Sequence, residues 1–255
     1  MQNAIRPLAI ITGGSRGLGY EAAKALALRG FDLALIAKDG ARLATSAQTI
    51  RDYAVQSAIS DLHISTFTCD LEQPNQVRDT IGAITQSLPT PHVLMLAHGV
   101  MSEKMSKTLK TTDQEWRRVM AINLDSVFQL VNGLAPAMAD ARNGRIIIFS
   151  ACLGRMSGPG NAGGLAPYRI SKAGVNALVR NLAHETGLGA RGLLVDAICP
   201  NHSRTDMGGP DAPRSAEEGA ATAVWLATRI FNPAGSTDQE KVTGVLWEDE
   251  EIVPW

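Results

Sequence analysis

Two residues four positions apart, Tyr168 and Lys172, offer the clearest chemistry in the sequence. Residues spaced i and i+4 share one face of a helix, so the phenol and the ammonium can lie close together. An unperturbed tyrosine, with a pKa of about 10, is a weak base at neutral pH, and a neighbouring ammonium stabilises the phenolate. The pair predicts a proton-transfer site with Tyr168 as acid/base and Lys172 in support. The alternative is an ordinary pair on an exposed helix.

A glycine-rich turn, TGGSRGLG (12–19), follows the apolar run 8–12 and opens an amphipathic stretch. Glycines let a backbone turn tightly and bring its N–H groups against a pyrophosphate, and the dipole of the following helix favours the anion. We expect this turn to bind a dinucleotide, the alternative being a purely structural turn. The cofactor-binding residues predicted here are Gly13, Ser15, Arg16, Gly17, Leu18 and Gly19.

The charges near the second predicted strand bear on the choice between NAD(H) and NADP(H). An acid at the end of that strand accepts the ribose hydroxyls of NAD, but here the strand ends Ile36-Ala37-Lys38, with no acid at Ile36 or Ala37. Arg16 and Lys38 are both placed to reach a 2′-phosphate, which needs compensating cations, so NADP(H) is favoured. Asp39 weakens this case if it points inward. Asp70, after the third predicted strand, is expected to accept from an adenine amino group, or else to be an ordinary acid near a helix N-terminus.

Strand and helix patterns alternate along the chain and position these residues. Apolar runs separated by amphipathic stretches indicate a parallel sheet covered by helices on both faces. We predict an α/β Rossmann fold, a single domain over 1–255 with a doubly wound sheet of seven parallel strands and the site at its carboxyl edge. The predicted strands are 8–12, 31–37, 63–70, 92–97, 144–150, 192–199 and 243–248. The predicted helices are 18–28, a stretch through about 56, 75–87, 112–139, 166–187 and 215–229.

Bulk composition excludes several classes of protein. A chain of 255 residues, 45% of them hydrophobic, buries enough surface to fold without metal or disulfide cross-links. The formal net charge of −1 argues against a nucleic-acid surface. No apolar run reaches 18 residues, so no membrane span is expected. Histidines and acids show no ligand-like spacing, so no metal site is expected either.

The three cysteines, Cys69, Cys152 and Cys199, are far apart and form no C-x-x-C motif. We expect three reduced thiols buried near strand ends, as suits a reducing cytoplasm. The N-terminal segment enters a strand-like apolar run within eight residues, which leaves no room for a signal peptide. The expected location is therefore cytoplasmic.

The combined motifs resemble the short-chain dehydrogenase/reductase family over essentially the whole chain. The matching pieces are the glycine turn, Asp70, Asn123 in INLDSVF, and the pair Tyr168 and Lys172. The resemblance implies a seven-stranded Rossmann sheet and reversible hydride transfer between a nicotinamide cofactor, here expected to be NADP(H) from the charges above, and a small carbonyl or alcohol substrate. It also implies a homodimer or a homotetramer.

The resemblance further implies roles for single residues. Asn123 interrupts the helix 112–139 and helps to hold a water that relays protons, and Lys172 also holds the nicotinamide ribose. Gly99 is the glycine that the family keeps near the cofactor. Thr205 stands where the family binds the carboxamide.

The carbonyl-polarising serine is where the sequence departs from the family. The family places it three residues before a glycine, and counting back from Gly154 puts Ala151 there, with Ser150 one residue early. An offset of one residue on a strand turns the side chain to the other face. Three alternatives stay open: a bulge re-aims Ser150, the glycine-rich loop 154–167 delivers Ser157, or no serine fills the role.

Two further departures lie near the cofactor. His98 ends a Leu-Ala-His run where the family shows Asn-Asn-Ala; it is either a structural replacement or a contact to substrate or nicotinamide. Asn201 replaces the glycine of a Pro-Gly pair. His202 next to it is either a general acid or a histidine of a surface loop.

The motifs and their departures leave two functions open. The first is an NADPH-dependent carbonyl reductase, or the reverse alcohol dehydrogenase, with the catalytic set Tyr168, Lys172, Asn123 and Ser150. The alternative is a catalytically weak or inactive NADP(H)-binding sensor or partner protein, suggested by the departures at Ala151, 96–98 and Asn201. The sequence names no substrate.

Overall fold

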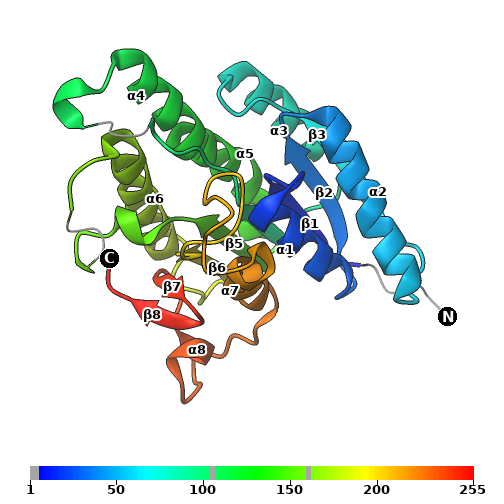
Figure 1. The fold of residues 1–255 in the computed structure, drawn as a ribbon. Helices are drawn as coiled ribbons and strands as arrows, with labels where there is room; N and C mark the ends of the chain where they lie inside the picture. The colour runs from blue at the N-terminus through cyan, green and yellow to red at the C-terminus, as the bar shows by residue number, and fades with distance from the viewer. Residues whose placement is uncertain (1–5, 104–106, 159–161) are drawn as a thin grey trace.

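The computed structural model describes residues 6–103, 107–158 and 162–255, and its strands form one sheet (Figure 1). The strand order is β3-β2-β1-β4-β5-β6-β7-β8. The first seven strands pair in parallel and the eighth pairs antiparallel with the seventh. The strands are β1 (Leu8–Thr12), β2 (Asp32–Ala37), β3 (Ile64–Thr68), β4 (Val93–Leu96), β5 (Gly144–Phe149), β6 (Leu193–Ile198), β7 (Leu246–Glu248) and β8 (Glu251–Val253).

Helices connect the parallel strands in the order that the sequence predicts. The α-helices are α1 (Gly17–Ala27), α2 (Gly40–Gln56), α3 (Pro74–Ser87), α4 (Asp113–Met120), α5 (Ser126–Asp140), α6 (Ala166–Glu185), α7 (Ala216–Thr228) and α8 (Asp238–Lys241). Short 3₁₀ turns lie at Thr108–Lys110 and Cys152–Gly154, and a π-helical turn lies at Ala121–Asp125. The predicted Rossmann fold is confirmed.

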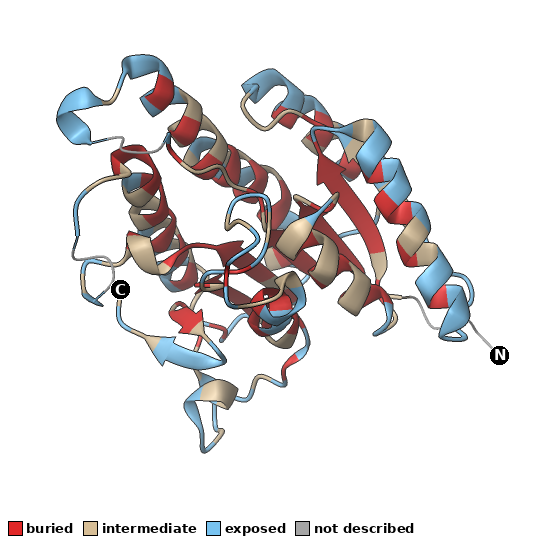
Figure 2. Cartoon of the chain, in the orientation of Figure 1, coloured by how far each residue is buried: buried red, intermediate tan, exposed pale blue. Residues whose placement is uncertain are grey.

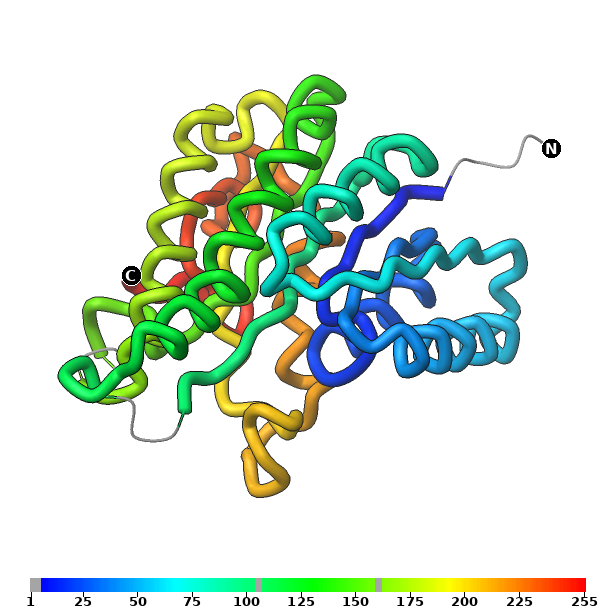
Figure 3. The backbone as a smooth tube through the Cα atoms, turned by 90° about the horizontal axis from the view of Figure 1, so that it is seen from above, coloured from blue at the N-terminus to red at the C-terminus, as the bar shows by residue number. Residues whose placement is uncertain are grey.

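The core has two layers, one on each face of the sheet (Figure 2). Along β1, Leu8 and Ile10 point to one layer while Ala9 and Ile11 point to the other, as the two-residue period of a strand requires. The first layer packs against α3, α5 and α6, and the second against α1, α2 and α7. Figure 3 shows α3, α5 and α6, drawn from cyan to yellow-green, on one side of the sheet. Burial on both faces explains why the parallel strands read as continuous apolar runs.

The expectation of a wholly parallel sheet of seven strands is incomplete, because β8 adds an antiparallel edge. Asp249 and Glu250 connect β7 to β8 with positive φ angles of 53° and 63°. The strand Glu251–Val253 is short and largely exposed, so it contains no apolar run from which it could be predicted. Short, charged strands are a common way to end a sheet without inviting further pairing.

The strand order places the site. The chain leaves β1 toward β2 and later returns to β4 on the other side of β1, so the connections diverge at the carboxyl ends of β1 and β4. In open α/β sheets such a switch point forms the crevice in which ligands bind.

Candidate functional site

A cavity of about 160 Å³ lies at this switch point, at the carboxyl ends of β1, β4, β5 and β6. It brings together eight of the predicted site residues: Arg16, Gly17, Leu18, Gly99, Ser150, Tyr168, Lys172 and Thr205. The other predicted residues lie around it without lining it: Gly13, Ser15, Gly19, Lys38, Asp70 and Asn123. Sequence reasoning thus placed the acid/base pair and half of the glycine turn at one site.

The glycine turn fits a bound pyrophosphate. Gly13 has a φ of +69°, and a Cβ built there lies 3.3 Å from the carbonyl oxygen of Ala97. A Cβ on Gly19 lies only 2.5 Å from the carbonyl oxygen of Gly13, so this helix position accepts no side chain. Among the described residues no side chain caps the N-terminus of α1. Its first N–H groups are therefore left to an anionic ligand.

Tyr168 and Lys172 lie buried on the first turns of α6, on the same face. Lys172 Nζ donates to the carbonyl oxygen of Phe149 at 2.6 Å and lies 6.0 Å from the centre of the Tyr168 ring. Burial raises the pKa of Tyr168 to about 12 and lowers the pKa of Lys172 to about 8. The expected lowering of the tyrosine pKa relies on the nicotinium charge as well as on the ammonium, and in the protein alone desolvation raises this pKa instead. At neutral pH the phenol keeps its proton.

Asn123 occupies the π-helical turn between α4 and α5. Its Oδ1 accepts from Val100 N at 2.8 Å, while Nδ2 donates to Val100 O at 2.9 Å and to Ser171 Oγ at 3.1 Å. The carboxamide thereby ties the segment after β4 to helix α6. The predicted interruption of the helix 112–139 is confirmed, and wide π-helical turns of this kind are frequent at functional sites.

Ser150 lines the cavity, but its hydroxyl is already engaged by the protein. Ser150 Oγ donates to Asn176 Oδ1 at 2.5 Å, with Lys172 O as a second contact at 3.3 Å. Ser157 Oγ donates to the carbonyl oxygen of Trp255 at 3.1 Å and so fastens its loop to the C-terminal segment. Residues 159–161 of that loop lie outside the described residues. Neither serine presents a free hydroxyl proton to the cavity.

His98 is tied into the fold through both ring nitrogens. Nδ1 faces Thr12 Oγ1 at 2.6 Å, and Nε2 faces Ile122 O at 3.0 Å and Ser126 Oγ at 2.9 Å. Burial, with Lys172 nearby, lowers the pKa of His98 to about 3, so the imidazole is neutral. His98 joins the end of β1 to the π-helical turn and to the start of α5, which is the role predicted for a structural replacement. His202 is exposed, with Nε2 2.7 Å from Gly208 O.

The charges around the outer part of the site are mostly paired. Lys38 Nζ lies 2.8 Å from Asp70 Oδ2, so the two predicted cofactor contacts face each other. Asp39 caps α2 by accepting from Arg42 N at 2.9 Å and does not point into the site. Arg16 forms an ion pair with Asp206 of the loop after β6.

Arg42 is a basic residue of this group that sequence reasoning missed. Its Nη1 lies 3.9 Å from the carboxylate of Asp206, beside the Arg16 pair. A basic residue three positions after a capping aspartate, in the first helical turn, is opposed by the helix dipole. That mismatch was the available signal that Arg42 lies near acidic side chains, which are those of Asp39 and Asp206.

A second cavity of about 510 Å³ adjoins the first and shares Ser150, Tyr168 and Thr205 with it. Its wall is largely apolar and includes Leu18, Met101, Leu153 and Met207. A Cys152–Cys199 disulfide also lines it, so the expectation of three reduced cysteines is wrong for two of them. Both follow neighbouring parallel strands, β5 and β6, whose carboxyl ends lie side by side. Cys69 is free and buried, as expected.

Comparison with known proteins assigns the chain to a family. The sequence profile of the short chain dehydrogenase family matches residues 7–215. The chain belongs to this family and is one of its oxidoreductases. It is 30% identical over 200 residues to the 3-oxoacyl-[acyl-carrier-protein] reductase of Escherichia coli. The aligned region covers 78% of this chain and 75% of that reductase. The corresponding Pseudomonas aeruginosa reductase is 31% identical over 211 residues, and the aligned region covers 82% of this chain and 79% of that reductase.

Solved structures agree on the fold. A short chain dehydrogenase from Salmonella enterica superimposes with a TM-score of 0.79 at 23% identity, covering 95% of both chains. The actinorhodin polyketide ketoreductase with NADPH superimposes with a TM-score of 0.74 at 22% identity, covering 88% of this chain and 91% of that one. Over the part of the chain that the structure describes, no helix is long and apolar enough to cross a membrane.

Proposed function

We propose that this chain is an NADP(H)-dependent carbonyl reductase, also able to run the reverse alcohol oxidation, with Tyr168 as its acid/base. We take residues 1–255 to form a single catalytic domain. The observation that carries the proposal is the buried pair of Tyr168 and Lys172 in one cavity with the glycine turn. The curated relatives are reductases by name, which supports the same reaction class.

The protein's own residues explain the proton transfer. Bound NADPH supplies the hydride that reduces the carbonyl carbon. Tyr168 donates its proton to the carbonyl oxygen, and its raised pKa keeps that proton in place at neutral pH. Lys172 would hold the nicotinamide ribose of a bound cofactor, and its positive charge beside the phenol would stabilise the negative charge that develops. Asn123 keeps α6 in register with the segment after β4 and is proposed to position the relaying water.

A basic group supports NADP(H) over NAD(H). Arg16 and Arg42 converge on the carboxylate of Asp206, which supports the proposal that these two cations stabilise the 2′-phosphate of NADP(H). Lys38 lies at the end of β2, and Asp39 beside it is used as a helix cap. Among the described residues, no acidic side chain at the end of β2 points inward, where it would repel a phosphate.

The substrate is proposed to be a small carbonyl compound with an apolar body. The larger cavity has the volume and the apolar wall of a small-molecule site, and Tyr168 lies at its junction with the cofactor cavity. The names of the relatives point to 3-oxoacyl compounds as the first class to test. A homodimer or homotetramer in the cytoplasm remains our proposal for its assembly and location.

A second function is favoured by one observation at the polarising position. Ala151 has no hydroxyl, and Ser150 donates its only hydroxyl proton to Asn176. Loss of one such donor costs about a hundredfold or more in rate in other enzymes. A weak or inactive NADP(H)-binding protein that serves as a sensor or partner is therefore the alternative.

The experiment follows NADPH oxidation by absorbance with a panel of 3-oxoacyl thioesters, activated ketones and aldehydes, with NADH in parallel. Turnover with NADPH that falls at least about a hundredfold in Tyr168→Phe supports the reductase. Equal turnover in both proteins would remove Tyr168 from the mechanism. NADPH binding without turnover of any compound would favour the sensor.

A further inference from the structure

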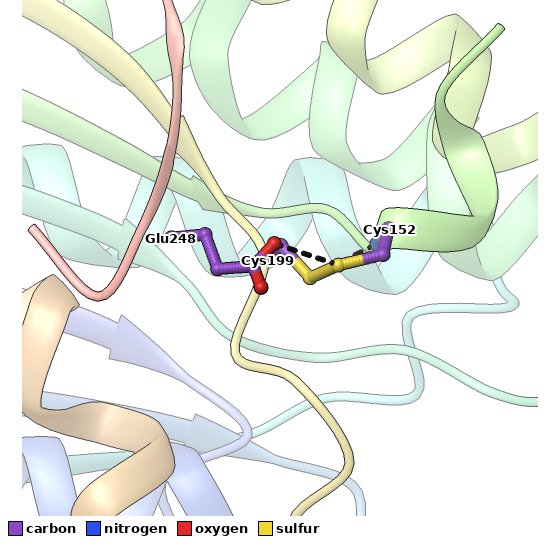
Figure 4. A group of neighbouring side chains, drawn as sticks. All are labelled: Cys152, Cys199 and Glu248. Atoms are coloured by element: carbon purple, nitrogen blue, oxygen red, sulfur yellow. Dashed lines mark hydrogen bonds between the residues drawn. A yellow bond between two sulfur atoms is a disulfide. The ribbon is translucent and has the colours of Figure 1, made fainter. Parts of the chain in front are cut away.

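A carboxylate faces the disulfide in the wall of the larger cavity. Cys152 follows β5, Cys199 follows β6 and Glu248 ends β7, and Figure 4 shows the three side chains converging. Glu248 Oε2 lies 3.0 Å from Cys152 Sγ. One ligand atom from each of the three residues lies within 4.8 Å of the others. Three neighbouring parallel strands thus deliver two sulfurs and a carboxylate to one point.

We propose that the reduced form of this cysteine pair, together with Glu248, is a binding site for Zn²⁺. Two thiolates and one carboxylate are a donor set that suits Zn²⁺, whereas Mg²⁺ and Ca²⁺ prefer oxygen ligands alone. Three protein ligands with a fourth position open to a cavity are the pattern of exchangeable zinc sites rather than closed structural ones. The site goes beyond the proposed hydride transfer and does not depend on it.

The backbone already has the spacing that this ion needs. Tetrahedral Zn²⁺ with bonds of about 2.3 Å to sulfur holds two thiolates about 3.8 Å apart. The Cα atoms of Cys152, in the 3₁₀ turn after β5, and of Cys199, directly after β6, lie 5.5 Å apart. The present spread of the three ligand atoms is no larger than 4.8 Å, so rotation of the cysteine side chains suffices. Strand ends are rigid supports for such a site.

Asn201 supplies an independent observation at the same point. Its Oδ1 lies 3.7 Å from Cys152 Sγ and 4.0 Å from Cys199 Sγ. Its Nδ2 is buried and has no hydrogen-bond partner within the described residues. An amide N–H in this place can donate to a thiolate or to a water on the ion, and such hydrogen bonds tune metal sites. The φ of +57° that presents Asn201 is a conformation that asparagine tolerates better than most residues.

The oxidation state of the pair decides whether the ion binds. A phosphine reductant cleaves the S–S bond: phosphorus is oxidised to the phosphine oxide with the oxygen of one water, and the two sulfurs take two electrons and the two protons of that water. Zn²⁺ then displaces the two thiol protons. Because a disulfide has no thiolate to offer, disulfide and zinc exclude each other.

The test uses the full chain and Co²⁺ as a spectroscopic stand-in for Zn²⁺. The protein is reduced with a phosphine under argon, desalted and titrated with CoCl₂, followed by ZnCl₂. We expect thiolate-to-cobalt charge-transfer absorption that saturates at one equivalent and disappears as Zn²⁺ displaces Co²⁺. The oxidised protein gives no such band. Absence of the band from the reduced protein would overturn the proposal.

Matched variants locate the ligands. Cys152→Ser and Cys199→Ser are expected to lose the band, and Glu248→Gln to weaken Zn²⁺ binding at least about tenfold. Cys69→Ala removes the remaining thiol, which is buried elsewhere, and is expected to keep full binding. Far-UV circular dichroism checks each fold, and Glu248→Gln, being isosteric, carries the test if a serine variant unfolds. A band retained in both serine variants, or lost in Cys69→Ala, contradicts the assignment.

Discussion

At the scale of single residues, the site combines a buried tyrosine that we propose as proton donor with the absence of a hydroxyl at position 151. Tyr168 is buried and protonated at neutral pH, which is the state that carbonyl reduction needs. Ser150 has a single hydroxyl proton and donates it to Asn176. Ala151, which stands where the family has its serine, has none to give. If the chain is the reductase we propose, its carbonyl is therefore polarised by Tyr168 alone.

Restoring a hydroxyl at position 151 tests this interpretation. We expect Ala151→Ser to raise kcat about tenfold or more, because a second donor then faces the developing negative charge. Ser150→Ala is the matched control and is expected to change kcat by less than about threefold. Steady-state kinetics with one ketone checks both. A large loss in Ser150→Ala with no gain in Ala151→Ser would make Ser150 the polarising residue.

Lys172 links the stability of the cofactor-free protein to pH. Its pKa falls from 10.5 to about 8 on burial, so below pH 8 the folded state holds a desolvated charge. Between about pH 8 and 10.5 the unfolded chain binds more protons than the folded one, so the lysine's contribution to stability rises with pH. We expect the free energy of unfolding of the wild type to rise by about 3 kcal/mol relative to that of Lys172→Met between pH 8 and pH 10.5. Urea unfolding at pH 7.5 and pH 10.5 measures it, and parallel curves for the two proteins would contradict the shift.

Some single-residue roles were open to sequence reasoning and others were not. Tyr168 and Lys172 followed from helical spacing, since both lie on one face of α6. The pairing of Lys38 with Asp70 and the engagement of Ser150 by Asn176 were not predictable. Each of these pairs joins segments whose contact depends on the packing of separate elements.

At the scale of elements, the loop after β6 bends over the glycine turn. The methyl group of Thr205 lies 3.2 Å from a Cβ built on Gly17. Asp206 next to it pairs with Arg16 and approaches Arg42. The loop thereby places a carboxylate on the cations that we assign to the phosphates of the cofactor.

Removing this carboxylate is expected to strengthen cofactor binding. Asp206→Asn frees Arg16 and Arg42, so the Kd for NADPH should fall about threefold to tenfold at low salt, with a smaller effect on NADH. Asp211→Asn makes the same charge change at an exposed position of the same loop and is the control. Fluorescence titration measures both constants. An unchanged or higher Kd in Asp206→Asn would mean that Asp206 does not compete with the phosphate.

A buried ion pair joins β6 to the helix after it. Arg229 Nη2 lies 3.2 Å from Asp196 Oδ2, and both side chains are almost fully buried. We expect Arg229→Met to lower the free energy of unfolding by about 3–5 kcal/mol, because it leaves the Asp196 carboxylate buried without its counter-charge. Urea unfolding measures the loss. Arg117→Met, which breaks an exposed pair with Asp113, is the control and should leave stability unchanged.

The sequence predicted elements better than it predicted their irregularities. Each predicted strand matches an observed strand to within three residues at either end. Parallel strands buried on both faces consist of continuous apolar runs, which are easily recognised in a sequence. The strand Glu251–Val253 went unpredicted because an exposed edge strand shows no such run. The π-helical turn at Ala121–Asp125 was expected only through the family resemblance.

At the scale of the whole molecule, the strand order brings together cavity residues that lie far apart in the sequence. Residues that line the cofactor cavity come from the ends of four strands and from α6, spread from Arg16 to Met207. The alternation of strands and helices was enough to predict this shared edge. The Cys152–Cys199 pair was not predictable, since 47 residues separate the two sulfurs and only the adjacency of β5 and β6 brings them together.

The central claim is hydride transfer from NADPH to a carbonyl carbon with Tyr168 as the proton donor. The most direct measurement uses NADPH deuterated at the transferring position of nicotinamide C4, with a ketone turned over by the wild type, and analyses the alcohol by mass spectrometry. The account predicts one deuterium on the carbinol carbon in the wild-type product and little product from Tyr168→Phe. An alcohol without deuterium, or deuterated product formed equally fast by both proteins, would contradict it.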